Sequence, residues 1–102
     1  MIYIKLHQTD KGVIIAMCDE KLIGKVLKDK YLEMDIKKYS DFYKGDLVKP
    51  EDAEGIIKDS SFYSANIVGD ESVKTFENAK GIGAGSIRKI GNVSFLQVFN
   101  LL

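Results

Sequence analysis

The 102-residue sequence lacks tryptophan and contains one cysteine, one proline and one histidine. The single cysteine, Cys18, excludes an internal disulfide and a cysteine-based zinc site, and it favours an intracellular, reducing compartment. No stretch approaches the ~20 apolar residues that cross a bilayer. The first residues, MIYIKLH, lack the basic segment and apolar core of a signal peptide. We therefore expect a cytoplasmic protein that does not contact membranes.

The sequence also lacks an excess of charge of either sign, since 15 Lys and Arg balance 15 Asp and Glu. This balance argues against a protein that binds nucleic acid through its net charge. A local basic patch is still compatible with it, because most of the lysines precede Pro50. The length suits one domain, which we expect to span residues 1–102.

The apolar pattern predicts an α+β fold, in which a mostly antiparallel β-sheet has N- and C-terminal hairpins and two main helices packed on it. Alternation over 2–6, turn residues over 8–12 and an apolar run from Val13 to Cys18 predict the N-terminal hairpin. The other expected elements are a helical turn at 20–23 capped by Asp19, strands at 26–27 and 31–36, a helix from Pro50, a strand at 62–68, a helix at 70–80, and a closing hairpin of 87–90 and 93–99.

The stretch Phe62 to Glu71 (FYSANIVGDE) is expected to be the centre of the fold, where a buried strand turns abruptly into a helix. Gly69 can adopt a backbone conformation that side chains forbid. Asp70 is the expected N-cap of the helix. Asn66 is a polar residue among apolar neighbours, so its side chain either bonds to local backbone or faces a ligand.

A reactive thiol at Cys18 would need a base, and His7 is the only histidine. A hairpin that turns at 9–12 places Cys18 opposite Tyr3, with His7 about 13 Å away along the strand. The cysteine is therefore expected to be a buried structural residue.

Other patterns that carry chemistry are weak. The carboxylates of Glu33 and Asp35 share one strand face, as charges on any solvated strand do, and the sequence has no metal-ligand spacing. The glycine-rich segment Gly81 to Gly85 follows a helix and lacks the ending of a phosphate loop, which predicts a helix stop and a connecting loop. We expect no catalytic residue, metal or cofactor.

The irregular segment Lys37 to Lys49 interleaves lysines with aromatic residues. Lysines can neutralise phosphates, and aromatic rings can stack on unpaired bases. The alternative is that Phe42 and Tyr43 anchor the loop while the lysines are solvated. The first interpretation predicts a nucleic-acid-binding site, on RNA or a ribosomal particle, formed by Lys25, Lys38, Phe42, Tyr43, Lys44, Asn66, Arg88 and Lys89.

Two further hypotheses stay open. An enzyme or small-ligand protein would gather Cys18, Asp19, Asn66 and Asp70 in a pocket where the short helical turn meets the central strand. An adaptor would use the segment Lys37 to Lys49 on a protein partner, and the balanced net charge favours this slightly. The sequence leaves the oligomeric state undetermined.

Several short motifs, taken in order, resemble an archaeal family known as domain of unknown function family 424. They are Met1 to Lys5 (MIYIK), Cys18 to Lys25 (CDEKLIGK), Phe42 to Gly45 (FYKG), Ala65 to Glu71 (ANIVGDE), and Ile90 to Val93 (IGNV) with Gln97. The resemblance implies an archaeal, cytoplasmic protein associated with translation and RNA-related genes. The family tends to have a histidine shortly before this glutamine, and here the run is Ser94 to Gln97 (SFLQ), so a role for that histidine cannot apply.

Overall fold

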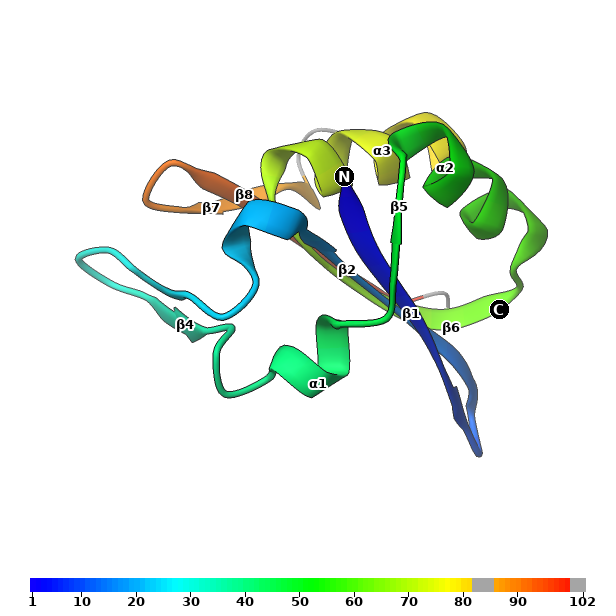
Figure 1. Ribbon diagram of the computed structural model, residues 1–102, viewed down its shortest axis with the longest axis horizontal. Helices are drawn as coiled ribbons and strands as arrows, with labels where there is room; N and C mark the ends of the chain where they lie inside the picture. Colours follow the sequence, from blue (N-terminus) through cyan, green and yellow to red (C-terminus); the bar gives the residue numbers. More distant parts are fainter. Residues whose placement is uncertain (82–85, 100–102) are drawn as a thin grey trace.

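The computed structural model describes residues 1–81 and 86–99. A six-stranded sheet in the order β5-β1-β2-β6-β8-β7 forms its centre, and a separate two-stranded sheet pairs β3 with β4. Figure 1 shows helices α2 and α3 on one side of the large sheet, with the small sheet and α1 toward the other side. The described elements are β1 (Ile2–Thr9), β2 (Gly12–Asp19), the 3-10 helix η1 (Glu20–Leu22), β3 (Val26–Lys28), β4 (Glu33–Asp35), α1 (Ser40–Tyr43), β5 (Asp46–Val48), α2 (Pro50–Asp59), β6 (Phe62–Val68), α3 (Asp70–Lys80), β7 (Arg88–Ile90) and β8 (Val93–Phe99).

The two predicted hairpins are confirmed. Strands β1 and β2 are antiparallel from the pair Ile2 and Asp19 to the pair Thr9 and Gly12, which leaves a two-residue turn. Cys18 lies opposite Tyr3, as the alternation predicted. The closing hairpin joins β7 and β8 through Gly91 and Asn92, and Gly91 has a positive φ of 58°.

The centre of the sheet is the parallel pair β2 and β6, which runs from Val13 and Phe62 to Cys18 and Val68. All other strand pairs within the described residues are antiparallel. A parallel pair needs a long crossover, because the chain must return to the same end of the sheet. Here β3, β4, α1, β5 and α2 all lie in that crossover.

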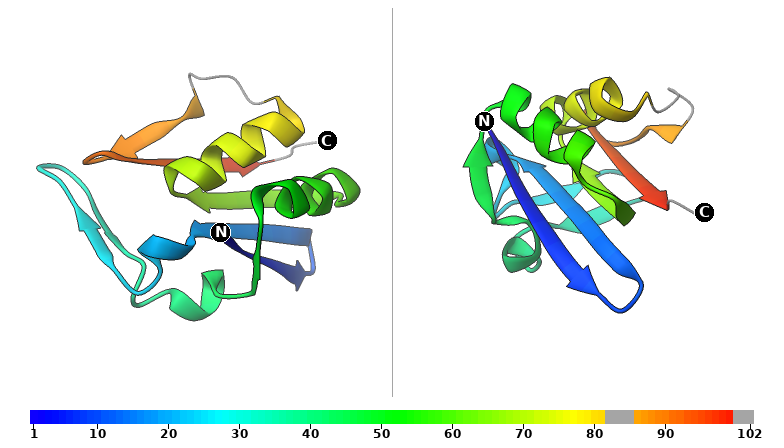
Figure 2. Two further views of the ribbon diagram at one scale, coloured as in Figure 1. Left: turned by 45° about the horizontal axis from the view of Figure 1, so that its top comes forward. Right: turned by 90° about the vertical axis from the view of Figure 1, so that its right-hand side faces the viewer.

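Helices α2 and α3 cover one face of the sheet, as predicted (Figure 2). Pro50 begins α2 at a position where its missing N–H is harmless. The main core lies between these helices and the sheet, and residues on one face of the central strands contribute to it. Its fully or nearly buried members include Ile2, Ile15, Met17, Ala53, Ile57, Ala65, Ile67, Phe76 and Leu96.

Two elements were not predicted, and both lie in the irregular segment before Pro50. Helix α1 is a single turn, and β5 is a three-residue strand that extends the sheet beside Ile2, Tyr3 and Ile4. Neither has enough residues for a periodic pattern to develop. Most of the predicted loop Gly81 to Gly85 lies outside the described residues. Among the residues that are described, no helix has the length and apolarity to span a membrane.

Candidate nucleic-acid interface

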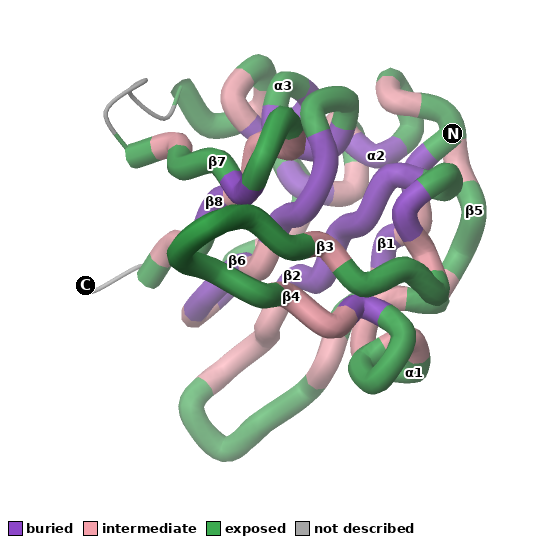
Figure 3. The backbone as a smooth tube through the Cα atoms, turned by 90° about the vertical axis from the view of Figure 1, so that its left-hand side faces the viewer, coloured by how far each residue is buried: buried purple, intermediate pink, exposed green. Residues whose placement is uncertain are grey.

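A second, smaller core lies on the sheet face opposite α2 and α3. Because side chains alternate along a strand, Cys18 and Val68 point away from the main core. They pack with Ile36 and with the half-buried Leu27 and Met34. The two-stranded sheet, residues 26–35 and called the arm below, therefore lies on this face (Figure 3). Leu27 and Met34 are its residues that pack against the smaller core.

The aromatic residues of α1 hold that helix against the sheet. Phe42 stacks on His7 with ring centroids 4.5 Å apart and 8° between the planes. The Nε2 atom of His7 also donates to the Phe42 carbonyl oxygen at 2.8 Å. Tyr43 packs into the smaller core, and burial raises its pKa to about 12. Both rings therefore match the alternative in which they anchor the loop, and neither is freely available for base stacking.

Three predicted lysines lie at the ends of the arm and of α1, and all are exposed. The carbonyl oxygen of Lys25 accepts a hydrogen bond from the backbone N–H of Lys37, so the two ends of the arm lie side by side. The N–H of Lys38 donates to the Asp35 carboxylate at 2.9 Å. Lys44 follows directly after α1. The structure thus brings Lys25 and Lys38 into one basic region and places Lys44 on the adjoining turn.

The predicted pair Arg88 and Lys89 is divided between the two faces of the sheet. The Arg88 guanidinium lies 5.4 Å from the ring centroid of Phe95, a residue of the smaller core, so it belongs to the arm side. Lys89 lies opposite Ser94 and is close enough to Asp70 to help lower the pKa of that carboxyl. The alternation of a strand could have predicted this separation from the sequence.

Asn66 lies on the arm side of β6, because its neighbours Ala65 and Ile67 belong to the main core. Its strand partners are Ala16 and Gln97. The side chain is half-buried. It therefore faces away from the helices at the middle of the sheet, a position from which it can meet a molecule bound on the arm side.

The tip of the arm carries residues that the sequence analysis did not select. Tyr31 is 83% exposed, the highest value among the exposed large hydrophobic side chains, and Leu32 beside it is also exposed. Their backbone N–H groups both donate to Asp29 Oδ1 at 2.9 Å. The second oxygen of Asp29 accepts from the N–H of Gly91 at 3.0 Å. These bonds, with Gly91 first, lower the pKa of Asp29.

Asp29 therefore joins the arm tip to the turn of the closing hairpin. Figure 1 shows both hairpins projecting in the same direction from the body of the molecule. Each tip is a solvated turn on its own, and such turns are usually mobile. The shared carboxylate fixes one against the other.

Charge is distributed unevenly between the helical layer, α2 and α3, and the rest of the chain. Helices α2 and α3 contain seven acidic and three basic residues. The rest of the chain contains twelve basic and eight acidic residues. The balanced total therefore hides a helical layer with a net charge of about −4 and a remainder of about +4, counted with formal charges.

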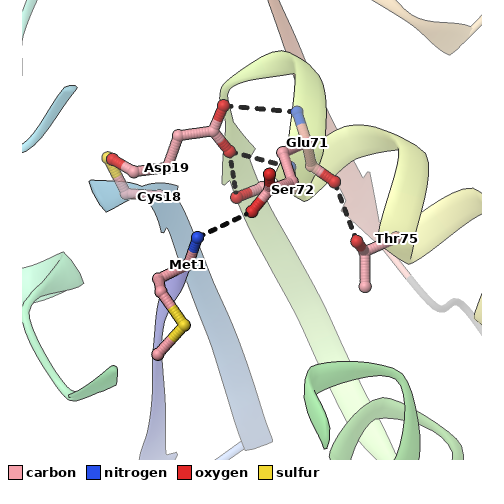
Figure 4. Close-up of polar contacts among 6 residues, drawn as sticks. All are labelled: Met1, Cys18, Asp19, Glu71, Ser72 and Thr75. Carbon is pink, nitrogen blue, oxygen red and sulfur yellow. Dashed lines mark hydrogen bonds and ion pairs between the residues drawn. The ribbon is translucent and has the colours of Figure 1, made fainter. Parts of the chain in front are cut away.

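The alternative site around Asp19 proves to be a structural cap (Figure 4). The carboxylate of Asp19 is buried, and it accepts hydrogen bonds from Ser72 N–H at 2.8 Å, Ser72 Oγ at 2.7 Å and Glu71 N–H at 3.2 Å. These donors lie in the first turn of α3, whose amides have no partner within the helix. Asp19 therefore caps a helix that begins about fifty residues later in the chain.

This arrangement corrects two predictions. Asp70 does not cap α3, because Gly69 occupies the N-cap position with a φ of 110°, and Asp70 instead accepts from the N–H of Ser94 at 2.8 Å. Asp19 does not cap η1 through its side chain, which is turned toward α3. The close approach explains the glycine, since a Cβ on Gly69 would overlap the Asp19 carboxyl group.

A hollow of about 290 Å³ adjoins this cap, but it does not gather the four predicted residues. Asp19 and Asp70 line it together with Met1, Glu20, Lys21 and Glu71, whereas Cys18 and Asn66 do not. Cys18 is 0% exposed, and burial raises the pKa of its thiol to about 12. Cys18 is therefore a buried structural residue, as predicted, and its burial disfavours the thiolate that a nucleophile needs.

The described part of the chain holds no group of three or more His, Cys, Asp or Glu side chains placed to bind a metal ion. Glu33 and Asp35 share one face of the arm, each opposite a different residue, Lys28 and Val26 respectively. Glu33 is exposed, and the half-buried Asp35 accepts the N–H of Lys38, so the two carboxylates have separate surroundings.

The sequence model of a protein family described as "Protein of unknown function (DUF424)" matches residues 6–101. The crystal structure of an uncharacterised conserved protein from Methanopyrus kandleri is similar to this fold, with a TM-score of 0.82 and 26% sequence identity. The similarity covers 96% of this chain and 90% of that one. No curated protein matches the chain significantly.

Proposed function

The chain belongs to the DUF424 family of proteins of unknown function, and from that premise we propose that it is an RNA-binding module that contacts RNA or a ribonucleoprotein particle in translation. One observation carries the proposal. Acidic residues outnumber basic ones on α2 and α3, whereas residues 25–38, the arm and its two ends, carry five lysines against three acidic residues. This segment also carries the exposed ring of Tyr31, so it offers a polyanion a basic surface with an exposed aromatic residue. Lysines that neutralise phosphates supply the sequence-independent part of RNA affinity.

The roles of the residues follow from their positions. Lys25, Lys38, Lys44 and Arg88 contact phosphates from the arm side. Asn66 offers its amide to a base edge or to the ribose at the middle of the sheet. Phe42 and Tyr43 hold α1 in place and act on RNA only through that position. Lys89 lies toward α3 and contributes a more distant charge.

The test is a binding measurement on the full chain with bulk cellular RNA and with ribosomal subunits, each titrated with salt. Each phosphate contact on a single strand adds about 0.7 to the slope of log K against log salt. The double substitution of Lys38 and Lys44 by Ala should therefore weaken binding and reduce the slope by about 1.4. A matched control replaces Lys58 and Lys74, two exposed lysines of the acidic helical layer, and should leave the slope unchanged.

Binding that ignores salt, or that falls equally in the two double variants, would refute the proposal. If the wild-type chain retains no RNA at any salt concentration but does retain a protein, the result would favour the adaptor hypothesis instead. In that case, the Lys38 and Lys44 variants of this chain would be tested for binding to the captured protein.

A further inference from the structure

The arm tip combines an exposed aromatic ring with nearby positive charge. The ring of Tyr31 is 83% exposed, and the ammonium group of Lys30 lies 5.5 Å from its centroid. Lys28 is exposed two residues earlier, where it faces Glu33 across the arm. A base stacked on Tyr31 would thus place its own phosphate near at least one ammonium group.

The backbone that carries this ring is also held in place, which distinguishes it from an ordinary solvated loop. Asp29 accepts the N–H groups of Tyr31 and Leu32 and, from the other hairpin, that of Gly91. The base of the arm is fixed separately, because Leu27 and Met34 pack into the smaller core. Because the backbone of the tip is already ordered, only the side-chain torsions of Tyr31 remain to be fixed when a ligand stacks on the ring.

We infer that the arm tip is a stacking platform for an unpaired nucleotide, so that the protein binds single-stranded segments of RNA in preference to duplex. Tyr31 supplies the ring, Lys28 and Lys30 contact the flanking phosphates, and Asp29 is the positioning residue that holds the backbone of the tip in place. This inference rests on the proposed function, and it adds the class of RNA and the contact that selects it. Bases in a duplex are already stacked on one another and cannot offer a free face to a protruding ring.

The experiment measures fluorescence anisotropy with a labelled single-stranded RNA of mixed sequence and with the corresponding duplex. Stacking of one base on an aromatic side chain is worth about 1–3 kcal/mol, so Tyr31→Ala should weaken single-strand binding by roughly 5- to 150-fold. Tyr31→Phe keeps the ring and should bind within about twofold of the wild type, by the same reasoning. Duplex binding should be the same in all three proteins.

The variants separate stacking from charge. Tyr31→Ala should leave the salt slope unchanged, because the ring contacts no phosphate. Replacing Lys28 and Lys30 together should lower the slope by about 1.4, whereas the Lys58 and Lys74 control should not change it. Asp29→Ala frees the tip, so it should weaken single-strand binding even though Tyr31 is still present. If Asp29→Ala binds the single strand as tightly as the wild type does, Asp29 is not a positioning residue.

A cross-linking experiment locates the contact directly. RNA that contains photoreactive uridine is cross-linked to the full chain, and the protein is digested with trypsin, which cleaves after Lys and Arg. Cleavage after Lys30 and Lys37 releases the peptide 31–37 that carries Tyr31, whereas cleavage after Lys38 and Lys44 releases the peptide 39–44 that carries Phe42 and Tyr43. The inference predicts the cross-link in the first peptide.

Each outcome has a definite meaning. If the wild type binds the single strand in a salt-dependent way but Tyr31→Ala binds equally well, the inference is overturned and the proposed function stands. A cross-link confined to the peptide 39–44, or equal loss in Tyr31→Ala and Tyr31→Phe, also overturns the inference. If the wild type binds neither RNA at low salt, the proposed function fails and the inference fails with it.

Discussion

Replacing Asp19 by Ala should destabilise the protein by about 3 kcal/mol, although the residue lies outside α3, the helix that it caps. Loss of a side-chain cap costs typically 1–2 kcal/mol. Ser72 is fully buried, and its hydroxyl group would lose the Asp19 oxygen that lies 2.7 Å away. A buried polar group without its partner costs a further ~1–3 kcal/mol.

Urea unfolding followed by far-ultraviolet circular dichroism measures this effect, and the sequence has no tryptophan for a fluorescence assay. With a slope of roughly 1.5 kcal/mol per M, the Asp19→Ala variant should unfold at a urea concentration about 2 M lower. Asp19→Asn should cost about half as much as Asp19→Ala. Its amide keeps one acceptor oxygen for the helix, but an NH₂ donor replaces the second oxygen and cannot accept the remaining bonds. Asp59→Ala, at an exposed carboxylate in the last turn of α2, should stay within about 0.5 kcal/mol of the wild type.

A double-mutant cycle isolates the contact between Asp19 and Ser72. Ser72→Ala alone should cost about 1 kcal/mol, the net value of one hydrogen bond. In the Asp19→Ala background the same change removes an unsatisfied hydroxyl group and should cost nothing. A loss below about 1 kcal/mol for Asp19→Ala would show that the cap is not important for stability. The same cost of Ser72→Ala in both backgrounds would show that the hydroxyl bond does not contribute, since the bonds from the N–H groups of Glu71 and Ser72 are not tested by that change.

Three further predictions follow from the same region and from the arm. Gly69→Ala should lower the free energy of unfolding by more than about 2 kcal/mol, because of its positive φ and the overlap with Asp19, and a neutral result in urea would contradict the geometry. Cys18 should fail to react with a thiol reagent in the native protein and react once urea unfolds it; rapid native reaction would contradict its burial. The pKa of Asp29 is lowered in the folded protein, so its bonds stabilise the arm tip above the ordinary aspartate pKa and are lost as pH falls through the lower folded value. In an NMR titration, the chemical shift of the Gly91 amide should follow the protonation of Asp29, with a midpoint pH below the ordinary pKa range of aspartate. A midpoint within or above that range would refute the prediction.

Features set by neighbouring residues were predictable. The register of the first hairpin followed from a two-residue turn and strict alternation, and it placed Cys18 opposite Tyr3. The bounds of β6 and α3 agree with the predicted 62–68 and 70–80. In each case the periodicity and the helix signals lie within the element itself.

Features set by distant residues were not predictable. Asp70 has the expected residue type and place for an N-cap, yet Asp19 supplies the cap from a strand 53 residues away from Ser72. The ring of Phe42 could equally well stack on a base or on a protein group, and only its contact with His7 decides between them. The arm tip that carries Tyr31 is held by the bond between Asp29 and Gly91, which joins residues 62 positions apart.

The parallel pair at the centre of the sheet also governs the order in which this chain can fold. Strand β2 is complete at Asp19, but its partner β6 begins only at Phe62. During synthesis β2 can pair with β1, while its other edge, from Ile14 to Cys18, has backbone groups with no strand beside them. Such a long-range closure is slow, and an apolar strand with an open edge can associate with other chains while it waits. A chain that stops before β6 should therefore aggregate, because it is β6 that converts the first hairpin from an exposed edge into the middle of a sheet.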